Sequence, residues 1–217
     1  MKIITEPKED LLAQLRFECG RAAANVQVET DDGAVTLYGT VPNYAEKVAA
    51  IKAVRRVGGV TAVADEIVVK LPDHQKCTDA EIENAACNAI SWITTIPAES
   101  LLITPRNGRL TLEGSVETWS QRNAVEDVVR NLEGIVDLTN LITIKPQLLG
   151  PDVKTAIESS FQRHALLDAE KIDVEVTGTK VILRGTTSNF AEREEAEHAA
   201  RSARGVTDVE NQIVIVV

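Results

Sequence analysis

Alternating apolar and polar residues recur at three places along the chain, and each place predicts a pair of short strands. The alternating apolar positions are Val26 and Val28 with Val35 and Leu37, Leu101 and Ile103 with Leu110 and Leu112, and Ile172 and Val174 with Val181 and Leu183. Between the strands stand the turn sequences Asp32-Gly33, Asn107-Gly108 and Gly178-Thr179. Turns of this kind permit positive φ, so each place predicts a β-hairpin.

After each hairpin the apolar spacing changes to that of a helix. The expected buried stripes are Ala50, Ala53, Val54 and Val57; Val125, Val128, Val129 and Leu132; and Ala196, Ala199, Ala200 and Ala203. Each helix is preceded by a capping-box sequence, with Asn43, Thr118 or Asn189 followed three residues later by Glu46, Gln121 or Glu192. A third strand follows, with apolar residues at Val60, Ile67 and Val69; Ile135, Ile142 and Ile144; and Val206, Ile213 and Ile215.

Glycines keep the same register in all three copies. Gly39, Gly114 and Gly185 lie 75 and then 71 residues apart, and Gly59, Gly134 and Gly205 each follow twenty residues later. We expect the first set to let a strand bend into the helix, and the second set to end the helix in a left-handed conformation. Both sets are therefore interpreted as structural. A phosphate site would need glycines at a helix N-terminus, whereas the second set follows a C-terminus.

A further helix is predicted before each hairpin, over residues 8–24, 78–92 and 152 to about 167, the last after Pro151. The chain is therefore expected to be an α+β protein of three tandem αββαβ domains, residues 1–75, 76–147 and 148–217. Each domain should form a three-stranded mixed sheet with two helices on one face, and its strand–helix–strand crossover should be right-handed. Proline-bearing joints near residues 70–73 and 145–151 separate the units.

The three repeats resemble the BON domain, a bacterial module. The segments that carry the resemblance are "LYGTVPNYAEK…RRVGGVTAVADEIVV", "LEGSVETWSQR…RNLEGIVDLTNLITI" and "LRGTTSNFAER…RSARGVTDVENQIVI". The resemblance implies an αββαβ fold, a non-enzymatic role in osmotic and envelope stress, and binding to phospholipid surfaces. It also implies an alternative, because one relative that carries a second module binds potassium.

The charge balance narrows the range of partners. The chain of 217 residues has a net charge of −10, which argues against general binding to nucleic acid because phosphates require a basic surface. Neither a secretory signal nor a stretch long enough to span a membrane is visible, so we expect a cytoplasmic protein without a transmembrane segment. The resemblance implies a periplasmic or envelope location as the alternative.

An aromatic residue and two basic residues recur on each crossover helix. The aromatic positions are Tyr44, Trp119 and Phe190; the first basic positions are Lys47, Arg122 and Arg193; and the second are Arg55, Arg130 and Arg201. Residues i and i+3 are helix neighbours, so a cation can lie against each ring. This set is a candidate binding surface for lipid headgroups or an acidic partner, strongest in copy one, which also holds Arg56. The alternative is a solvated helix face whose long side chains cover the ring.

Catalytic or metal-binding chemistry is not indicated. His74, Cys77 and Cys87 match no zinc spacing, and three cysteines in all indicate unpaired thiols in a reducing compartment. Asp65 aligns with Asn140 and Asn211, so no repeated pair of acids is retained. We therefore predict no enzyme, metal or cofactor, and a stress-associated scaffold that contacts a phospholipid surface or a protein partner. The alternatives are a cytosolic potassium sensor, since potassium can be held by backbone carbonyls, and a pure protein-interaction scaffold.

Overall fold

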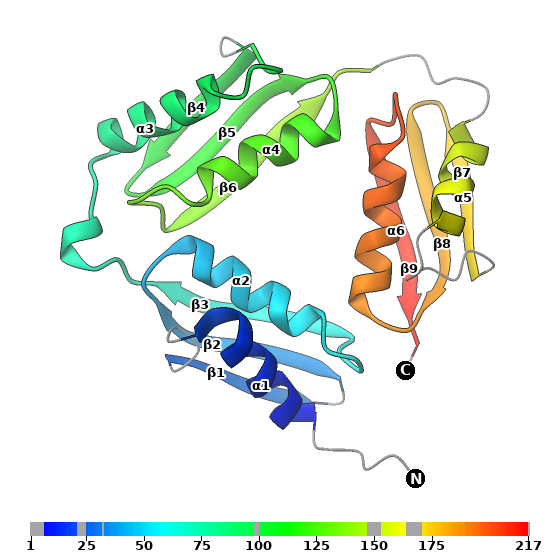
Figure 1. Cartoon of the computed structure of the whole chain (residues 1–217), viewed down its shortest axis with the longest axis horizontal. Helices are drawn as coiled ribbons and strands as arrows, with labels where there is room; N and C mark the ends of the chain where they lie inside the picture. The colour runs from blue at the N-terminus through cyan, green and yellow to red at the C-terminus, as the bar shows by residue number, and fades with distance from the viewer. Residues whose placement is uncertain are drawn as a thin grey trace.

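The computed structural model contains three α+β units of the same topology (Figure 1). It describes residues 7–20, 25–31, 33–97, 100–146, 153–163 and 171–216. Domain 1 comprises α1 (Pro7–Cys19), β1 (Val26–Asp31), β2 (Ala34–Val41), α2 (Tyr44–Arg55) and β3 (Ala62–Val69). After the short 3-10 helix η2 (Asp73–Gln75), domain 2 comprises α3 (Asp79–Ser91), β4 (Leu101–Arg106), β5 (Arg109–Val116), α4 (Trp119–Val129) and β6 (Asp137–Ile144). Domain 3 comprises α5 (Val153–Arg163), β7 (Ile172–Thr177), β8 (Lys180–Thr187), α6 (Phe190–Ser202) and β9 (Asp208–Ile215).

Each sheet has three strands in chain order, with the hairpin antiparallel and the crossover pair parallel. The predicted α+β class and the three repeated mixed sheets are thus confirmed. The leading helix of domain 1 ends at Cys19, earlier than predicted, and Gly20 follows with φ 53. The second leading helix, α3, nearly fills its predicted range of residues 78–92, whereas Pro151 and the predicted end of the third leading helix lie outside the described residues.

One face of each sheet carries the core, which both helices of that domain cover. The leading helices bury equivalent positions 75 and 71 residues apart, namely Leu11, Ala86 and Ile157, and Leu15, Ile90 and Phe161. Most of the predicted crossover stripes are buried as well. Val57, Leu132 and Ala203 are partly buried, whereas Val128 on α4 is 36% exposed, so the predicted stripe was wrong at Val128.

The predicted helix starts are confirmed. The side chains of Asn43, Thr118 and Asn189 each accept a hydrogen bond from the backbone N–H three residues later. This cap satisfies an amide that the first helical turn would otherwise leave unpaired. Because each helix starts with the same cap, Tyr44, Trp119 and Phe190 are its first residues and occupy equivalent places in the three domains.

Gly39, Gly114 and Gly185 have a more specific role than bending the chain into a helix. They lie inside β2, β5 and β8 with φ of 131°, 126° and 133°. A Cβ atom at Gly114 would lie 2.2 Å from the backbone oxygen of Ser100, just before the neighbouring strand. The close approach of two backbones therefore requires glycine at this position.

Candidate functional site

The first repeated basic position ties the crossover helix to the third strand of its own domain. Lys47 donates to the backbone oxygen of Ile67 at 2.9 Å and pairs with Asp65 at 2.9 Å. Arg122 donates to the backbone oxygens of Ile142 and Asn140 at 3.0 and 2.9 Å. Arg193 likewise donates to the backbone oxygen of Asn211, at 3.3 Å. These three basic side chains therefore have a structural role within each domain.

The aligned Asp65, Asn140 and Asn211 organise the same strand. Each side-chain oxygen accepts a hydrogen bond from the backbone N–H two residues later, at 3.0 to 3.1 Å. The amide groups of Asn140 and Asn211 also donate to Glu126 and Glu197, at 2.9 and 3.0 Å. Domain 1 has Ile51 at the equivalent helix position, and there the Asp65 carboxylate binds Lys47 instead. The residue at this position therefore matches the charge of its partner on the helix. Aspartate binds the cationic Lys47, and asparagine binds the anionic Glu126 and Glu197.

Replacing Asn140 with alanine is expected to lower the free energy of unfolding of domain 2 by about 1–3 kcal/mol. The change removes one hydrogen bond to the Ile142 N–H and one to the Glu126 carboxylate. Urea unfolding monitored by circular dichroism measures the loss. Asn131→Ala is the matched control, because Asn131 is exposed and donates to the backbone oxygen of Asp127 four residues earlier, and it should change stability by less than about 0.5 kcal/mol. Equal effects of the two variants would contradict the structural role of Asn140.

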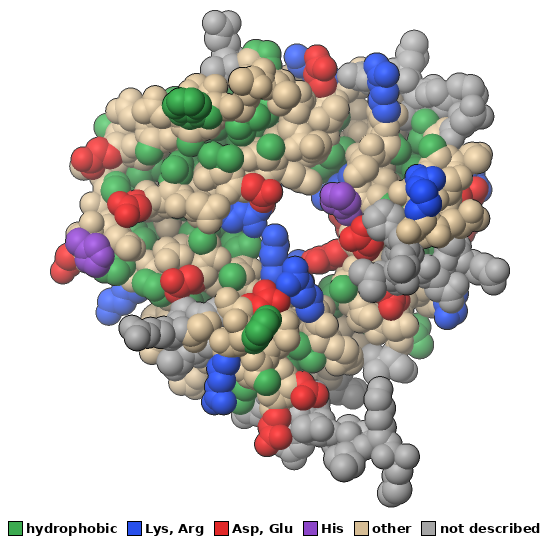
Figure 2. All heavy atoms as spheres, in the orientation of Figure 1, with side chains coloured by type: hydrophobic (Ala, Val, Ile, Leu, Met, Phe, Trp, Pro, Cys, Tyr) green, Lys and Arg blue, Asp and Glu red, His purple; other side chains and the backbone are tan. Residues whose placement is uncertain are grey.

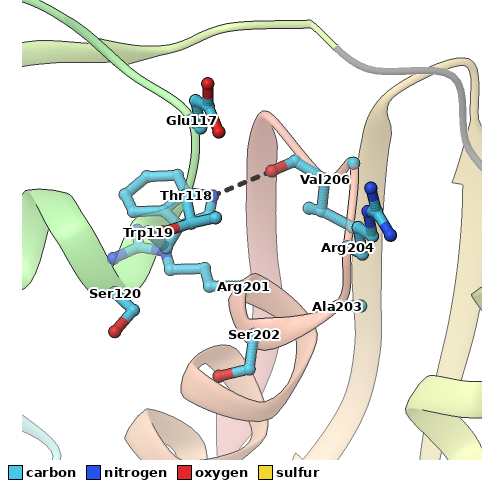
Figure 3. Close-up of a pocket in the computed structure, with 10 residues that line it drawn as sticks. Glu117, Thr118, Trp119, Ser120, Arg201, Ser202, Ala203, Arg204 and Val206 are labelled. Atoms are coloured by element: carbon cyan, nitrogen blue, oxygen red, sulfur yellow. Dashed lines mark hydrogen bonds between the residues drawn. The ribbon is translucent and has the colours of Figure 1, made fainter. Parts of the chain in front are cut away.

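The repeated aromatic residues contact the neighbouring domain. Tyr44 packs against the apolar core of domain 2, and Phe190 packs against that of domain 1. The indole Nε1–H of Trp119 donates to the backbone oxygen of Val206 in domain 3 at 3.1 Å (Figure 3). Burial raises the pKa of Tyr44, and the carboxylates of Asp137 and Glu126 in domain 2 raise it further. The three rings therefore join the domains in the order 1 to 2, 2 to 3 and 3 to 1.

The second repeated basic position receives these rings. The Arg201 guanidinium carbon lies 4.2 Å from the Trp119 ring centroid, and that of Arg55 lies 5.8 Å from the Phe190 centroid. Arg130 lies close enough to Tyr44 to oppose the rise in the tyrosine pKa. Such contacts contribute about 0.5–2 kcal/mol each, more when they are desolvated. The predicted ring–cation contact within one helix is present in domain 2, where Arg122 lies 5.0 Å from the Trp119 centroid.

The junction of domains 2 and 3 encloses a pocket of about 470 Å³ (Figure 3). It lies between the start of α4 and the end of α6, with Trp119 and Arg201 in its wall. Burial lowers the pKa of Arg122, Glu126 raises it, and the nearby Arg201 lowers it. Two arginines thus share one indole ring at this junction.

Three head-to-tail contacts of one kind arrange the domains as a closed ring. The helices α2, α4 and α6 face the centre of this ring (Figure 1), and an opening bordered by charged side chains is visible there (Figure 2). A head-to-tail contact that closes after three steps defines an approximate threefold axis.

The predicted surface residues are divided among several roles in this ring. The aromatic residues and Arg55, Arg130 and Arg201 lie at the domain contacts, while Lys47, Arg122 and Arg193 bind within their domains. Arg56 is exposed and pairs with Glu18 of α1 at 2.7 Å. Their role in binding an external surface stays a prediction. The constant spacing of eleven residues from ring to arginine was the available sequence signal for the contact with the next copy.

Sequence reasoning missed two large exposed aromatic residues. Phe17 is 87% exposed at the end of α1, and Trp92 is 84% exposed directly after α3. They are equivalent, because they lie 75 residues apart and each follows the last buried position of its leading helix by two residues. The third equivalent residue is the exposed Arg163, which ends α5. Phe17, Trp92 and Arg163 thus occupy one repeated position of the three domains, and we call them the rim residues.

Within the part of the chain that the structure describes, His, Cys, Asp and Glu form no group of three that could hold a metal ion. Cys77 and Cys87 are free thiols, and burial raises the pKa of Cys77. None of the described helices is long and apolar enough to cross a membrane.

The fold and these contacts define a class of protein, an α+β repeat protein in which one small domain occurs three times and contacts itself head to tail. The BON domain family matches residues 7–70, 78–146 and 151–216, and the chain belongs to this family. It is similar to the osmotically-inducible protein Y of Escherichia coli strain K12, with 24% identity over 127 residues. That match covers 57% of this chain and 63% of the relative's length.

Two solved structures align with most of the chain, at low TM-scores. One is the C-terminal domain of CdsD, a structural protein of the type III secretion system of Chlamydia trachomatis, with 16% identity, a TM-score of 0.26, and coverage of 96% of this chain and 98% of that one. The other is the PrgH periplasmic domain, with 10% identity, a TM-score of 0.23, and coverage of 96% and 100%. TM-scores this low add nothing to the assignment.

Proposed function

We propose that this protein is a non-enzymatic, stress-associated scaffold that attaches to phospholipid surfaces through its rim residues. The exposure of Phe17 and Trp92 at equivalent positions supports this most directly. Aromatic side chains insert at the level of lipid headgroups, and an arginine such as Arg163 can bind a phosphate. Membership of the BON family and the similarity to an osmotically inducible protein are consistent with a role in stress.

The charge of the protein determines which lipid it should favour. A net charge of −10 repels an anionic bilayer, so attachment should rest on the aromatic side chains rather than on a basic patch. The second basic position also supports this view, because Arg55 and Arg201 contact the rings of neighbouring domains and Arg130 lies near Tyr44. We therefore expect zwitterionic phosphatidylcholine vesicles to bind at least as well as vesicles that contain phosphatidylglycerol.

Replacing Phe17 and Trp92 with alanine together is expected to reduce the partition coefficient on phosphatidylcholine vesicles by about tenfold or more. Co-sedimentation with vesicles measures it. Leu102→Ala with Leu141→Ala is the matched control, since these leucines are 59% and 53% exposed but lie on the sheet of domain 2. Binding that survives the loss of both rim aromatics would contradict this site. Loss of binding in Lys47→Glu with Arg55→Glu, with the domains still folded, would favour the basic helix face instead.

A specific observation favours a protein partner as the second candidate. Leu102 and Leu141 flank Glu113 in one row across the sheet of domain 2, on strands β4, β6 and β5. The equivalent rows of the other sheets are polar, with Gln27, Tyr38 and Glu66, and with Asp173, Arg184 and Gln212. Two exposed leucines around one carboxylate are suited to a partner that presents an apolar face with a basic residue.

A further inference from the structure

The contact between domains 3 and 1 differs from the other two because only noncovalent interactions hold it. Domains 1 and 2, and domains 2 and 3, follow each other in the chain, whereas domain 2 separates domain 3 from domain 1. A short connection keeps two domains at a high effective concentration, so their contact re-forms easily after opening. The contact between domains 3 and 1, which we call the closing contact, has less of this advantage, because the whole of domain 2 separates its two sides in the sequence.

Phe190, the aromatic residue of this contact, is held less firmly than Trp119. Trp119 donates a hydrogen bond across its junction at 3.1 Å and has a guanidinium 4.2 Å from its ring centroid. Phe190 has no hydrogen-bonding group, and the guanidinium of Arg55 lies 5.8 Å from its centroid. Packing of Phe190 against the core of domain 1 supplies the apolar part of the contact.

An exposed ion pair supplies the polar part. Arg55 Nη1 lies 2.9 Å from Glu194 Oε1, and the two side chains are 40% and 50% exposed. Exposed pairs of this kind contribute about 0–1 kcal/mol, and salt screens them strongly. The closing contact therefore combines a salt-sensitive part with a modest apolar part, and it has no covalent connection of its own.

We propose that the contact between domains 3 and 1 is a latch that opens as ionic strength rises, while the other two contacts stay closed. Opening converts the ring into an open chain of three domains and exposes Phe190 with the domain 1 surface on which it rests. The inference does not depend on lipid binding, because the rim residues lie outside this contact.

Distance measurements between spin labels on the full chain test the latch. The native cysteines are first replaced by serine, and labels are attached at exposed sites. The pair Ala34→Cys and Thr177→Cys reports the distance between domains 1 and 3. The pair Ala34→Cys and Thr139→Cys reports the distance between domains 1 and 2. Between about 50 mM and about 1 M sodium chloride, the ratio of open to closed forms should rise about twofold to fivefold for the first pair only. Unchanged distances for the first pair, or equal changes in both pairs, would overturn the proposal.

Variants of the ion pair separate the latch from general effects of salt. Glu194→Arg places two like charges together and should open the ring even at low salt, whereas Arg55→Glu with Glu194→Arg should close it again. Glu175→Arg is the matched control, because Glu175 pairs with Arg184 at 2.7 Å inside domain 3 with similar exposures of 47% and 52%. The latch is refuted if Glu175→Arg opens the ring as much as Glu194→Arg does, or if the double variant stays open.

Discussion

Replacing Gly39 with alanine is expected to destabilise domain 1 by about 3 kcal/mol or more. Gly39 has φ 131°, where an L side chain is strained, and a Cβ atom there would lie 2.0 Å from the backbone oxygen of Asn25. That oxygen belongs to the backbone beside the edge strand β1, so it cannot move aside without breaking the pairing of β1 with β2. A small domain has only a few kcal/mol of net stability, so most of it would be lost.

Hydrogen exchange on the full chain should locate this loss, with amides of β1 and β2 exchanging much faster and those of domain 3 changing least. Gly58→Ala is the control in the same domain, because its position has no neighbouring atom within 4 Å and no positive φ. It should leave stability unchanged or raise it by about 0.4–1 kcal/mol, since alanine restricts the unfolded chain. If Gly39→Ala behaved like Gly58→Ala, the close approach of the two backbones would not be the reason for glycine here.

Local sequence patterns predicted each domain because each rests on interactions between residues close in the chain. The capping residues Asn43, Thr118 and Asn189 act within one helical turn, and the hairpin turns and apolar periods act within one element. The position of Val128 was wrong because the helix-spacing rule includes residues at the edge of the apolar stripe, and this one turns outward. The predicted role of Gly39 was less specific than the one found in the structure. The sequence pattern did not indicate that the backbone of Asn25, on the other side of the hairpin, approaches this glycine closely.

The residues that make the contacts between domains were not identified from the sequence, although their positions are repeated in it. Spacing on a helix indicates which side chains share a face, but not whether water or another domain covers that face. Tyr44, Trp119 and Phe190 were thus grouped with basic residues of their own helices, whereas the structure places each ring on the next domain. Phe17 and Trp92 were overlooked for a related reason, because an aromatic residue near a helix end reads as core until its exposure is known.

Replacing Trp119 with alanine is expected to weaken the junction of domains 2 and 3 by about 2–4 kcal/mol. The variant loses the hydrogen bond to the Val206 backbone oxygen, the contact with the Arg201 guanidinium, and the apolar area of the ring. It also leaves Arg201 beside an empty space at the junction. We expect domains 2 and 3 to unfold together in the native chain and separately in this variant, so differential scanning calorimetry should show an added transition at lower temperature.

Trp92→Ala is the control for this prediction, because the substitution removes a ring of equal size from the same domain and Trp92 is 84% exposed. It should leave the calorimetric profile unchanged, since a side chain surrounded by water contributes little to the folded state. Trp119→Phe separates the ring contact with Arg201 from the hydrogen bond to Val206. It keeps a ring for Arg201 but lacks the indole N–H, so its effect should lie between those of the native chain and Trp119→Ala. A single transition at an unchanged temperature in Trp119→Ala would show that the domains do not depend on each other through this ring.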